Sequence, residues 1–213
     1  SLNLTQLNGK QLSYNNLNDV FAALNISKSF QKNTGVVIIK HANPCGISIN
    51  KNKIKCFERA LSCDPISAFG GIVSCNFKID FKLALKLNKI FLEVIVANGF
   101  DKNALKLLKK KKNLRLLDAS NFLISENLKI NSFNGKLLIQ NDDKIQFTAK
   151  SFRVVSKRKP SDPQMRSLIF AFNICRYVKS NAIVLATNET TAGIGSGQPS
   201  RLDSCQIAID KMN

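Results

Sequence analysis

The chain has 213 residues, 44% of them apolar and 22% charged, which is typical of a globular protein that buries a substantial core. It has no apolar run near the roughly 20 residues of a transmembrane helix, and its six cysteines form no CxxC pair, so we expect neither a membrane partner nor a zinc or disulfide framework. The net charge of +18 raises an anionic partner such as nucleic acid, although the lysines are scattered along the chain rather than grouped.

The N-terminal region is predicted to form a polar turn followed by a short helix. Asn15, Asn16 and Asn18 favour the turn, and Asp19 is placed to cap the helix. The asparagines could contact a ligand, but turn formation is their commoner use. The segment before them lacks the charged and apolar regions of a signal peptide, which favours the cytoplasm. Because the chain begins at Ser1 rather than Met, we expect that it lacks an upstream part.

The next segment combines a buried strand with the chain's single histidine. The β-branched residues 36–39 predict the strand, and a loop set by Pro44 and Gly46 is expected after Lys40 and His41. Ligands bind open α/β sheets at the carboxyl ends of the strands, so this ammonium and imidazole are candidate site groups. On composition alone, a lysine and a histidine that merely cap a strand at the surface are the commoner case.

Helices and strands then alternate along the chain. A helix is predicted over 53–62, ended by the Asp64-Pro65 pair, and Gly70 and Gly71 form either a tight turn or a close approach to a ligand. A helix capped by Asp80 follows, then a strand over 91–100 that carries Glu93, a helix capped by Asp101 that ends in the lysine run 109–112, and a strand over 113–118.

The alternation from 36 to 118 indicates an α/β sheet with helical crossovers. Within it Glu93 needs a partner, because an ionisable group in a buried strand is costly when unpaired. A structural ion pair is the somewhat commoner solution, and a ligand contact is the other.

Polar loops and short strands at 136–140 and 144–149 suggest a boundary between subdomains beyond Ala119. Ser161 and Gln164 then form a capping box for a second long helix. The apolar stripe of this helix, which we expect to be core, consists of Met165, Leu168, Ile169, Phe172, Cys175 and Val178.

The last segment places a glycine-rich turn before a helix. A strand over 180–187 has Asn181 at its entrance, and GIGSGQPSR leads from it to the final helix. Three alternating glycines would expose N–H groups at the positive end of the helix dipole, and Arg201 adds a guanidinium, so the turn suits a phosphate or carboxylate. The spacing is neither a Walker loop nor the dinucleotide-binding fingerprint, so the motif alone is weakly specific.

Eight stretches occur in the order found in one family: GKQLSYNNLND, VIIKHANPCG, DPISAFGGIV, FLEVIVANGF, KKKNLRLL, YVKSNAIVLA, GIGSGQPSRLDS and IAIDK. Through them the chain resembles the transformylase part of the AICAR transformylase/IMP cyclohydrolase family. The resemblance implies an α/β fold with cytidine-deaminase-like α/β/α layers in two subdomains, residues 1–130 and an incomplete second at 131–213. His41 and the Pro44-Cys45 pair do not complete the H-x-E and P-C-x-x-C patterns of zinc deaminases, so no metal is expected.

The resemblance also implies the reaction, which is formyl transfer from 10-formyltetrahydrofolate to the amine of AICAR. That amine is a poor nucleophile and must lose a proton as it attacks, while negative charge develops on the formyl oxygen. By resemblance, His41 is the proton acceptor and Lys40 stabilises the transition state. A neighbouring ammonium would also help to keep the imidazole neutral.

Further site residues are carried over by the same resemblance. Leu202 matches a folate-side position, and the residues that match AICAR-binding positions are Gly70, Glu93, Asn181, Arg201 and, more weakly, Asn16. Three residues depart from the family pattern: Glu93 where some relatives have Asp, Asn98 in place of a usual proline, and Pro199 between Gln198 and Ser200.

The family's transformylase site forms at a homodimer interface, so the resemblance implies a homodimer. It also implies that a cyclohydrolase domain upstream and a folate-binding part downstream are missing, so the activity of this fragment alone stays open. The alternative is a non-catalytic basic module that holds a nucleotide or RNA. RNA binding calls for exposed aromatic residues among basic ones, and the chain has no Trp and two Tyr, so we expect no nucleic-acid partner.

Overall fold

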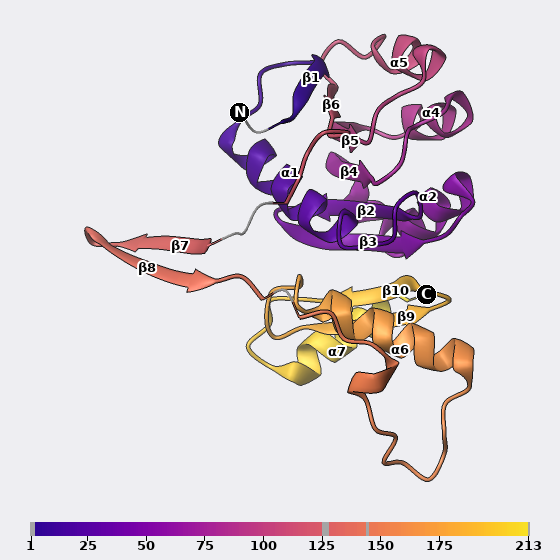
Figure 1. Ribbon diagram of the computed structural model, residues 1–213, viewed down its shortest axis with the longest axis vertical. Helices are drawn as coiled ribbons and strands as arrows, with labels where there is room; N and C mark the ends of the chain where they lie inside the picture. The colour runs from indigo at the N-terminus through magenta and orange to yellow at the C-terminus, as the bar shows by residue number, and fades with distance from the viewer. Residues whose placement is uncertain (1–2, 125–127, 144, 213) are drawn as a thin grey trace.

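The computed structural model describes residues 3–124, 128–143 and 145–212 and has an α/β fold with a mixed central sheet (Figure 1). The eight strands of the sheet lie in the order β1-β6-β5-β4-β2-β3-β10-β9. Strands β4, β5 and β6 are mutually parallel, and the other neighbours are antiparallel. The bounds of these strands are β1 Thr5–Asn8, β2 Gly35–Lys40, β3 Asn43–Ile49, β4 Gly71–Cys75, β5 Leu92–Ala97, β6 Arg115–Asp118, β9 Ile183–Thr187 and β10 Thr190–Gly195.

Seven α-helices lie in the described ranges. Their bounds are α1 Tyr14–Ser27, α2 Lys53–Ser62, α3 Pro65–Ala68, α4 Phe81–Asn88, α5 Lys102–Leu108, α6 Asp162–Cys175 and α7 Arg201–Asp210, with a 3-10 turn at Ala149–Ser151. None of the helices in this described part is long and apolar enough to cross a membrane.

The sheet has an apolar core on each face, because alternate strand residues point to opposite sides. Val36 and Ile38 of β2 face the cluster that contains α2, α4 and α5, whereas Val37 and Ile39 face the cluster that contains α1 and α6. The two expected subdomains meet within this one sheet, since β10 pairs with β3 and the hydroxyls of Ser48 and Thr190 lie 2.8 Å apart.

Several helix boundaries follow the sequence prediction because their signals are local. The helix predicted over 53–62 is α2, Asp80 accepts a hydrogen bond from the Leu83 amide at 2.9 Å, and Ser161 and Gln164 form the expected capping box. Asp101 also precedes α5, but its carboxylate pairs with Lys78 at 3.0 Å instead of capping. The lysine run 109–112 follows the end of α5.

The N-terminal prediction was wrong in two respects. A strand, β1, lies along the sheet edge, where no strand was expected. Helix α1 begins at Tyr14, capped by Ser13 and Asn16, so the expected polar turn is part of the helix and Asp19 lies inside it. Ser13 supplies the hydroxyl that the cap needs, so the helix begins at Tyr14 and not at Val20, where a cap at Asp19 would place its start.

Two predicted loops are in part strands. Pro44 and Gly46 belong to β3, where Gly46 is required because an added Cβ would lie 1.8 Å from the Ala60 carbonyl oxygen of α2. Gly193 and Gly195 belong to β10, where added Cβ atoms would meet carbonyl oxygens of α7 at 1.9 and 1.8 Å. These glycines therefore serve close helix–sheet packing and not a turn.

The predicted core stripe of α6 was wrong in part: Val178, just after the helix, is buried in the core, but other members of the stripe are exposed. Leu168 is 57% exposed and Phe172 49% exposed, whereas Phe170 and Ile174 are buried against the sheet. The outward side of α6 is covered in part by the segment before it. The centroid of the Phe172 ring lies 4.9 Å from that of Phe147 and 5.1 Å from that of Phe152. Apolar residues on both sides of the helix made its orientation ambiguous in the sequence.

A separate hairpin extends from the body of the fold (Figure 1). Strand β7 (Leu128–Phe133) was not predicted and pairs with β8 (Lys136–Asn141), which the sequence did predict. Every residue of both strands is exposed, including six large apolar side chains that are 56–62% exposed. The strand predicted over 144–149 is not formed at 145–149, and residue 144 lies outside the described residues.

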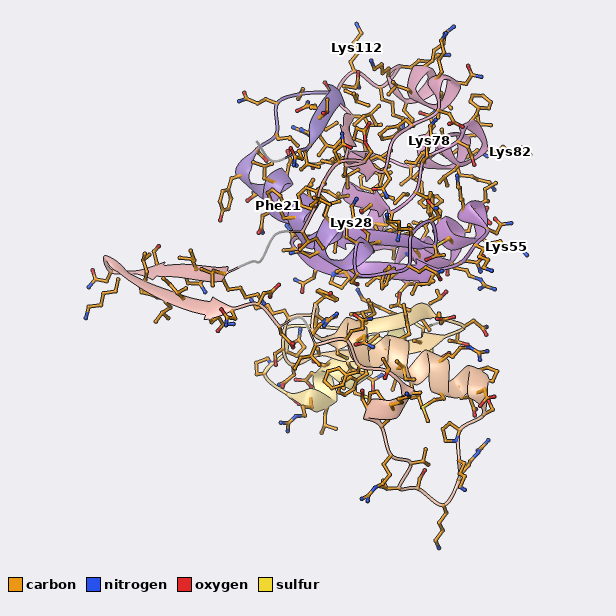
Figure 2. All side chains as sticks on the ribbon, in the orientation of Figure 1. Phe21, Lys28, Lys55, Lys78, Lys82 and Lys112 are labelled. Carbon is orange, nitrogen blue, oxygen red and sulfur yellow. The ribbon has the colours of Figure 1, made fainter. Side chains whose placement is uncertain are left out.

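Lysines project from many points of the surface. Figure 2 shows Lys55, Lys82 and Lys112 pointing outward from separate parts of the fold, in agreement with the scattered charge of the sequence. Lys28 differs, because its ammonium donates to the Asn98 side-chain oxygen at 2.7 Å and to the Ala119 carbonyl at 2.9 Å. Burial lowers the pKa of Lys28. Asn98, the residue that departs from the family pattern, is thus part of a structural contact.

Candidate functional site

A cavity of about 260 Å³ lies where the two halves of the chain meet. Its lining includes Lys40, His41 and Asn43 from the β2–β3 hairpin, Asp64 before α3, Ser196 after β10, and Lys211 after α7. Lys40 and His41 therefore share a concave site with groups from the C-terminal part of the chain. The volume is slightly below the roughly 300–1,000 Å³ of typical small-molecule sites.

The turn that carries His41 has an unusual backbone. Lys40 and Asn43 are paired across the hairpin, so His41 and Ala42 form a two-residue loop, with φ values of 51° and 58°. Such turns favour Asn and Gly, because a residue with a Cβ loses about 1–2 kcal/mol in the left-handed region. The same conformation occurs between β9 and β10, where Asn188 and Glu189 have φ values of 49° and 55°, so it is the geometry of a two-residue hairpin loop. At residues 41–42 this loop presents an exposed imidazole.

Contacts from two sides hold this turn. A carboxylate oxygen of Asp19 in α1 accepts a hydrogen bond from the Ala42 amide at 2.7 Å. The side-chain amide of Asn43 donates to the His41 carbonyl at 3.2 Å, and its oxygen accepts from the Lys179 amide at 3.3 Å. The strained turn is thereby tied both to α1 and to the segment that precedes β9.

Gly70 lies beside the Lys40 ammonium. Lys40 donates to the Phe69 carbonyl at 3.0 Å, and an added Cβ on Gly70 would lie 3.0 Å from the Lys40 nitrogen. Gly70 has a φ of +69°, and its amide donates to the Phe91 carbonyl at 2.8 Å. Glycine is needed here both for its backbone conformation and for the approach of the ammonium.

Glu93 has a partner, but not the ion pair that was the commoner expectation. Asn16 in α1 donates its side-chain amide to a Glu93 carboxylate oxygen at 2.9 Å. Asn16 is buried and Glu93 is half-buried. Two residues predicted separately as AICAR contacts, 77 positions apart in the chain, are thus in direct contact.

Asn181 and Arg201 lie around a second loop. The Asn181 side-chain amide donates to the carbonyls of Gln198 and Pro199 at 2.9 and 2.7 Å, so it shapes the loop before α7. Arg201, the first residue of α7, is exposed and forms no hydrogen bond or ion pair with the described residues. Neither side chain lines the cavity that contains His41.

The expected row of free N–H groups before α7 is mostly occupied. The Ser200 hydroxyl accepts from the amides of Leu202 and Asp203 at 3.2 and 3.4 Å. Gly197, the glycine that does lie in the loop, donates its amide to the Lys179 carbonyl at 2.8 Å. The Leu202 side chain is 81% exposed. Anion binding at this loop would therefore depend on the Arg201 side chain more than on backbone amides.

Asp19, Asp64 and Lys211 were not predicted as site residues. Asp64 is buried and forms an ion pair with Lys211 at the cavity. Burial alone would raise the pKa of Asp64, but hydrogen bonds from Lys211 and Ser67 outweigh this and lower it. The sequence signal for Asp64 was its place before a proline, which indicated only the end of a helix.

The cavity thiols are poor nucleophiles. Burial raises the pKa of Cys45 to about 12 and also raises that of Cys63. All six cysteines are free, as predicted, and four are buried. Among the described residues no group of three or more His, Cys, Asp or Glu side chains is arranged to hold a metal ion.

A larger hollow of about 690 Å³ lies between 156–168 and 186–188. Its charged lining residues are Arg158 and Lys159, and neither a carboxylate nor an imidazole from the described part of the chain lines it. Of these two cavities, only the smaller one is lined by an imidazole and a carboxylate from the described residues.

Comparison with known proteins identifies relatives over almost the entire chain. Residues 1–211 match the family model described as AICARFT/IMPCHase bienzyme. Proteins named bifunctional purine biosynthesis protein PurH from Bacillus thuringiensis (strain Al Hakam), Bacillus cereus (strain AH187) and Bacillus anthracis (strain A0248) are each 44% identical over 205 residues. The match covers 96% of this chain and 40% of each relative, so the chain spans less than half the length of these relatives.

Proposed function

The chain belongs to the AICARFT/IMPCHase bienzyme family, and on this premise we propose that it supplies formyl-transfer residues in purine biosynthesis. The reaction is transfer of the formyl group of 10-formyltetrahydrofolate to the amine of AICAR. The protein that contains this chain would also act as an IMP cyclohydrolase through a region outside it. The names of the matching family and of the PurH relatives support this role.

The observation that carries the proposal is the placement of Lys40 and His41. They stand at the end of a buried strand, next to each other and in one cavity, with the imidazole on a strained turn. We assign His41 as the base that accepts the proton of the attacking amine. We assign Lys40, held against the Gly70 turn, to the developing negative charge on the formyl oxygen.

AICAR would be bound by groups around this pair. Gly70 allows the substrate to approach the Lys40 side of the site, and the Asn16–Glu93 pair presents a carboxylate that can accept from an amine or a hydroxyl. Arg201 is a free guanidinium in the described chain, suited to a phosphate or carboxylate, and Asn181 holds the loop that precedes it. Leu202, exposed beside Arg201, is assigned to the folate side.

The same proposal covers the architecture and setting of the chain. The two parts, 1–130 and 131–213, would be a first deaminase-like subdomain and the beginning of a second, in α/β/α layers. The protein would act as a cytoplasmic homodimer that needs no metal and has no nucleic-acid or membrane partner. The positive charge suits the anionic substrates, since AICAR is a phosphate ester and folates carry carboxylates.

The test is formation of tetrahydrofolate by the protein expressed from its complete reading frame. We expect turnover only when AICAR and 10-formyltetrahydrofolate are both present. His41→Ala should lower kcat by about 10²–10⁴-fold, the usual contribution of a general base. Lys40→Met should lower it by about 10²–10³-fold, as for other groups that stabilise an oxyanion.

Lys55→Met is the matched control for Lys40→Met, because Lys55 is exposed on α2 and loses the same charge away from the cavity. It should keep wild-type turnover. The His41→Ala protein should melt at the wild-type temperature, since the imidazole is exposed. Near-normal turnover in His41→Ala would remove the proposed base. Tight RNA binding without any formyl transfer would instead favour the basic binding module.

A further inference from the structure

Helix α1 contacts the His41–Ala42 turn through the carboxylate of Asp19. Asp19 accepts the Ala42 amide at 2.7 Å, and this is the one hydrogen bond that its side chain forms among the described residues. Asp19 is half-buried and has no cation of the described chain within ion-pair distance. A half-buried carboxylate whose contact is the backbone of a strained turn has a structural purpose at that turn.

The contact acts on the conformation of His41. An Ala at φ 58° would relax toward the commoner negative φ if nothing held its amide in place. Because Ala42 directly follows His41, which has a φ of 51°, such relaxation would also rotate the peptide that aims the imidazole. The Asn43 side chain donates to the carbonyl of the same His41–Ala42 peptide at 3.2 Å, so Asn43 holds the oxygen of this peptide and Asp19 holds its N–H.

Helix α1 also carries Asn16, the partner of Glu93. Asn16 and Asp19 are three positions apart, so they lie on the same side of the helix, which faces the sheet. One rigid helix therefore fixes both the His41 turn and the Glu93 carboxylate. This couples the position of the base to that of a candidate substrate contact.

We propose that Asp19 is a positioning residue, which holds the His41–Ala42 turn in its left-handed conformation and thereby aims the imidazole into the cavity. The role of the turn in catalysis rests on the proposed function, but the restraint on the turn does not. The proposal distinguishes Asp19 from a residue of general structural importance, because relief of the strain should replace it. Glycine adopts a positive φ freely, so Ala42→Gly should remove the need for the carboxylate.

The experiment compares Asp19→Ala, Asp19→Asn and the double variant Asp19→Ala/Ala42→Gly. In the protein from the complete reading frame, Asp19→Ala should lower kcat by about 10–100-fold with KM for AICAR changed less than about threefold, as expected for a misplaced group. Asp19→Asn keeps an oxygen that can accept the amide and should lose less than about tenfold. The double variant should recover at least half of the logarithmic loss. Asn18→Ala, an exposed neighbour on α1, should match the wild type.

A second measurement does not depend on the reaction. In the protein from the complete reading frame, the imidazole NMR signals of His41, the only histidine of this chain, are identified as those lost in His41→Ala. These should be single and sharp in the wild type, shifted or doubled in Asp19→Ala, and restored in the double variant. Unchanged signals and kcat in Asp19→Ala, or a double variant no better than Asp19→Ala, would overturn the proposal. If Asp19→Ala does not fold, the other two variants decide. The proposal is supported if the double variant is folded and active and if Asp19→Asn has the signals and kcat of the wild type. It is overturned if the double variant stays unfolded. Restored signals without formyl transfer in any variant would refute the proposed function alone.

Discussion

Close packing of α7 on β10 at Gly195 gives a prediction that can be worked from the structure. An added Cβ would lie 1.8 Å from the Ser204 carbonyl oxygen, 2.6 Å from its carbonyl carbon and 3.0 Å from its Cα. All three are backbone atoms of a helix, so no side-chain rotation can relieve the contact. In Gly195→Ala the helix must therefore move away by about 1.5 Å to restore ordinary van der Waals distances.

We expect a cost of about 3 kcal/mol, the upper part of the usual range for an overpacked core. For a chain of this size that lowers Tm by roughly 6–12 °C. The displaced helix carries Arg201, and Ser204 donates to the Asn181 carbonyl at 2.9 Å, so affinity for AICAR should fall as well. Urea unfolding followed by circular dichroism and calorimetric titration with AICAR measure the two effects.

Gly197→Ala is the matched control two residues further on. Gly197 has a φ of +70°, but the nearest atom to an added Cβ is the Lys179 Cδ at 3.8 Å, so the substitution tests backbone strain without a clash. It should cost about 1 kcal/mol and lower Tm by roughly 2–4 °C. A Gly195→Ala protein that melts within about 2 °C of the wild type, or that is more stable than Gly197→Ala, would refute the packing argument.

Two other predictions concern the titratable groups of the cavity. Lys211→Met should leave the Asp64 carboxylate buried without its cation and cost about 3 kcal/mol at neutral pH. In the wild type the pKa of Asp64 is lowered by folding. Its carboxylate therefore stabilises the fold above the unfolded-state pKa of about 4, and this stabilisation is lost as the pH falls through the folded-state pKa. Asp64→Asn should flatten this acid dependence of stability in urea titrations at different pH values. With a thiol reagent at pH 8, the half-buried Cys175 and Cys205 should react before the buried Cys45, whose pKa of about 12 keeps it protonated; fast modification of Cys45 in the folded chain would contradict its burial.

The features predicted correctly from the sequence are those set by near neighbours in the chain. Asp80 and the Ser161–Gln164 pair form helix caps through contacts between residues three positions apart in the chain. The strand at 36–39 is indicated by its run of β-branched residues. The predicted glycine loops failed for the opposite reason. Gly46 is required by the carbonyl of Ala60, which comes from a different element, and a local pattern cannot show which partner a glycine approaches.

The candidate site follows the same division. Lys40 and His41 were candidates from their place after a buried strand, and their proposed roles came from the family resemblance. The residues that hold them in place were not predicted. Asp19 is 23 positions from the amide it binds, and in the sequence it has the ordinary signature of a helix cap. Lys211 is 147 positions from Asp64. Such pairs depend on how the sheet is assembled, and sequence spacing carries no information about that.

The exposed hairpin β7–β8 has a consequence for how the family can vary. Its first and last residues, Leu128 and Asn141, are paired across the two strands, so the chain leaves the body of the fold and returns at almost the same point. Its side chains belong to neither core cluster. We therefore expect that the segment can be lengthened or shortened without a compensating change in the core. Natural variation of length is expected to concentrate there, while the strand ends around Lys40 and His41 stay fixed.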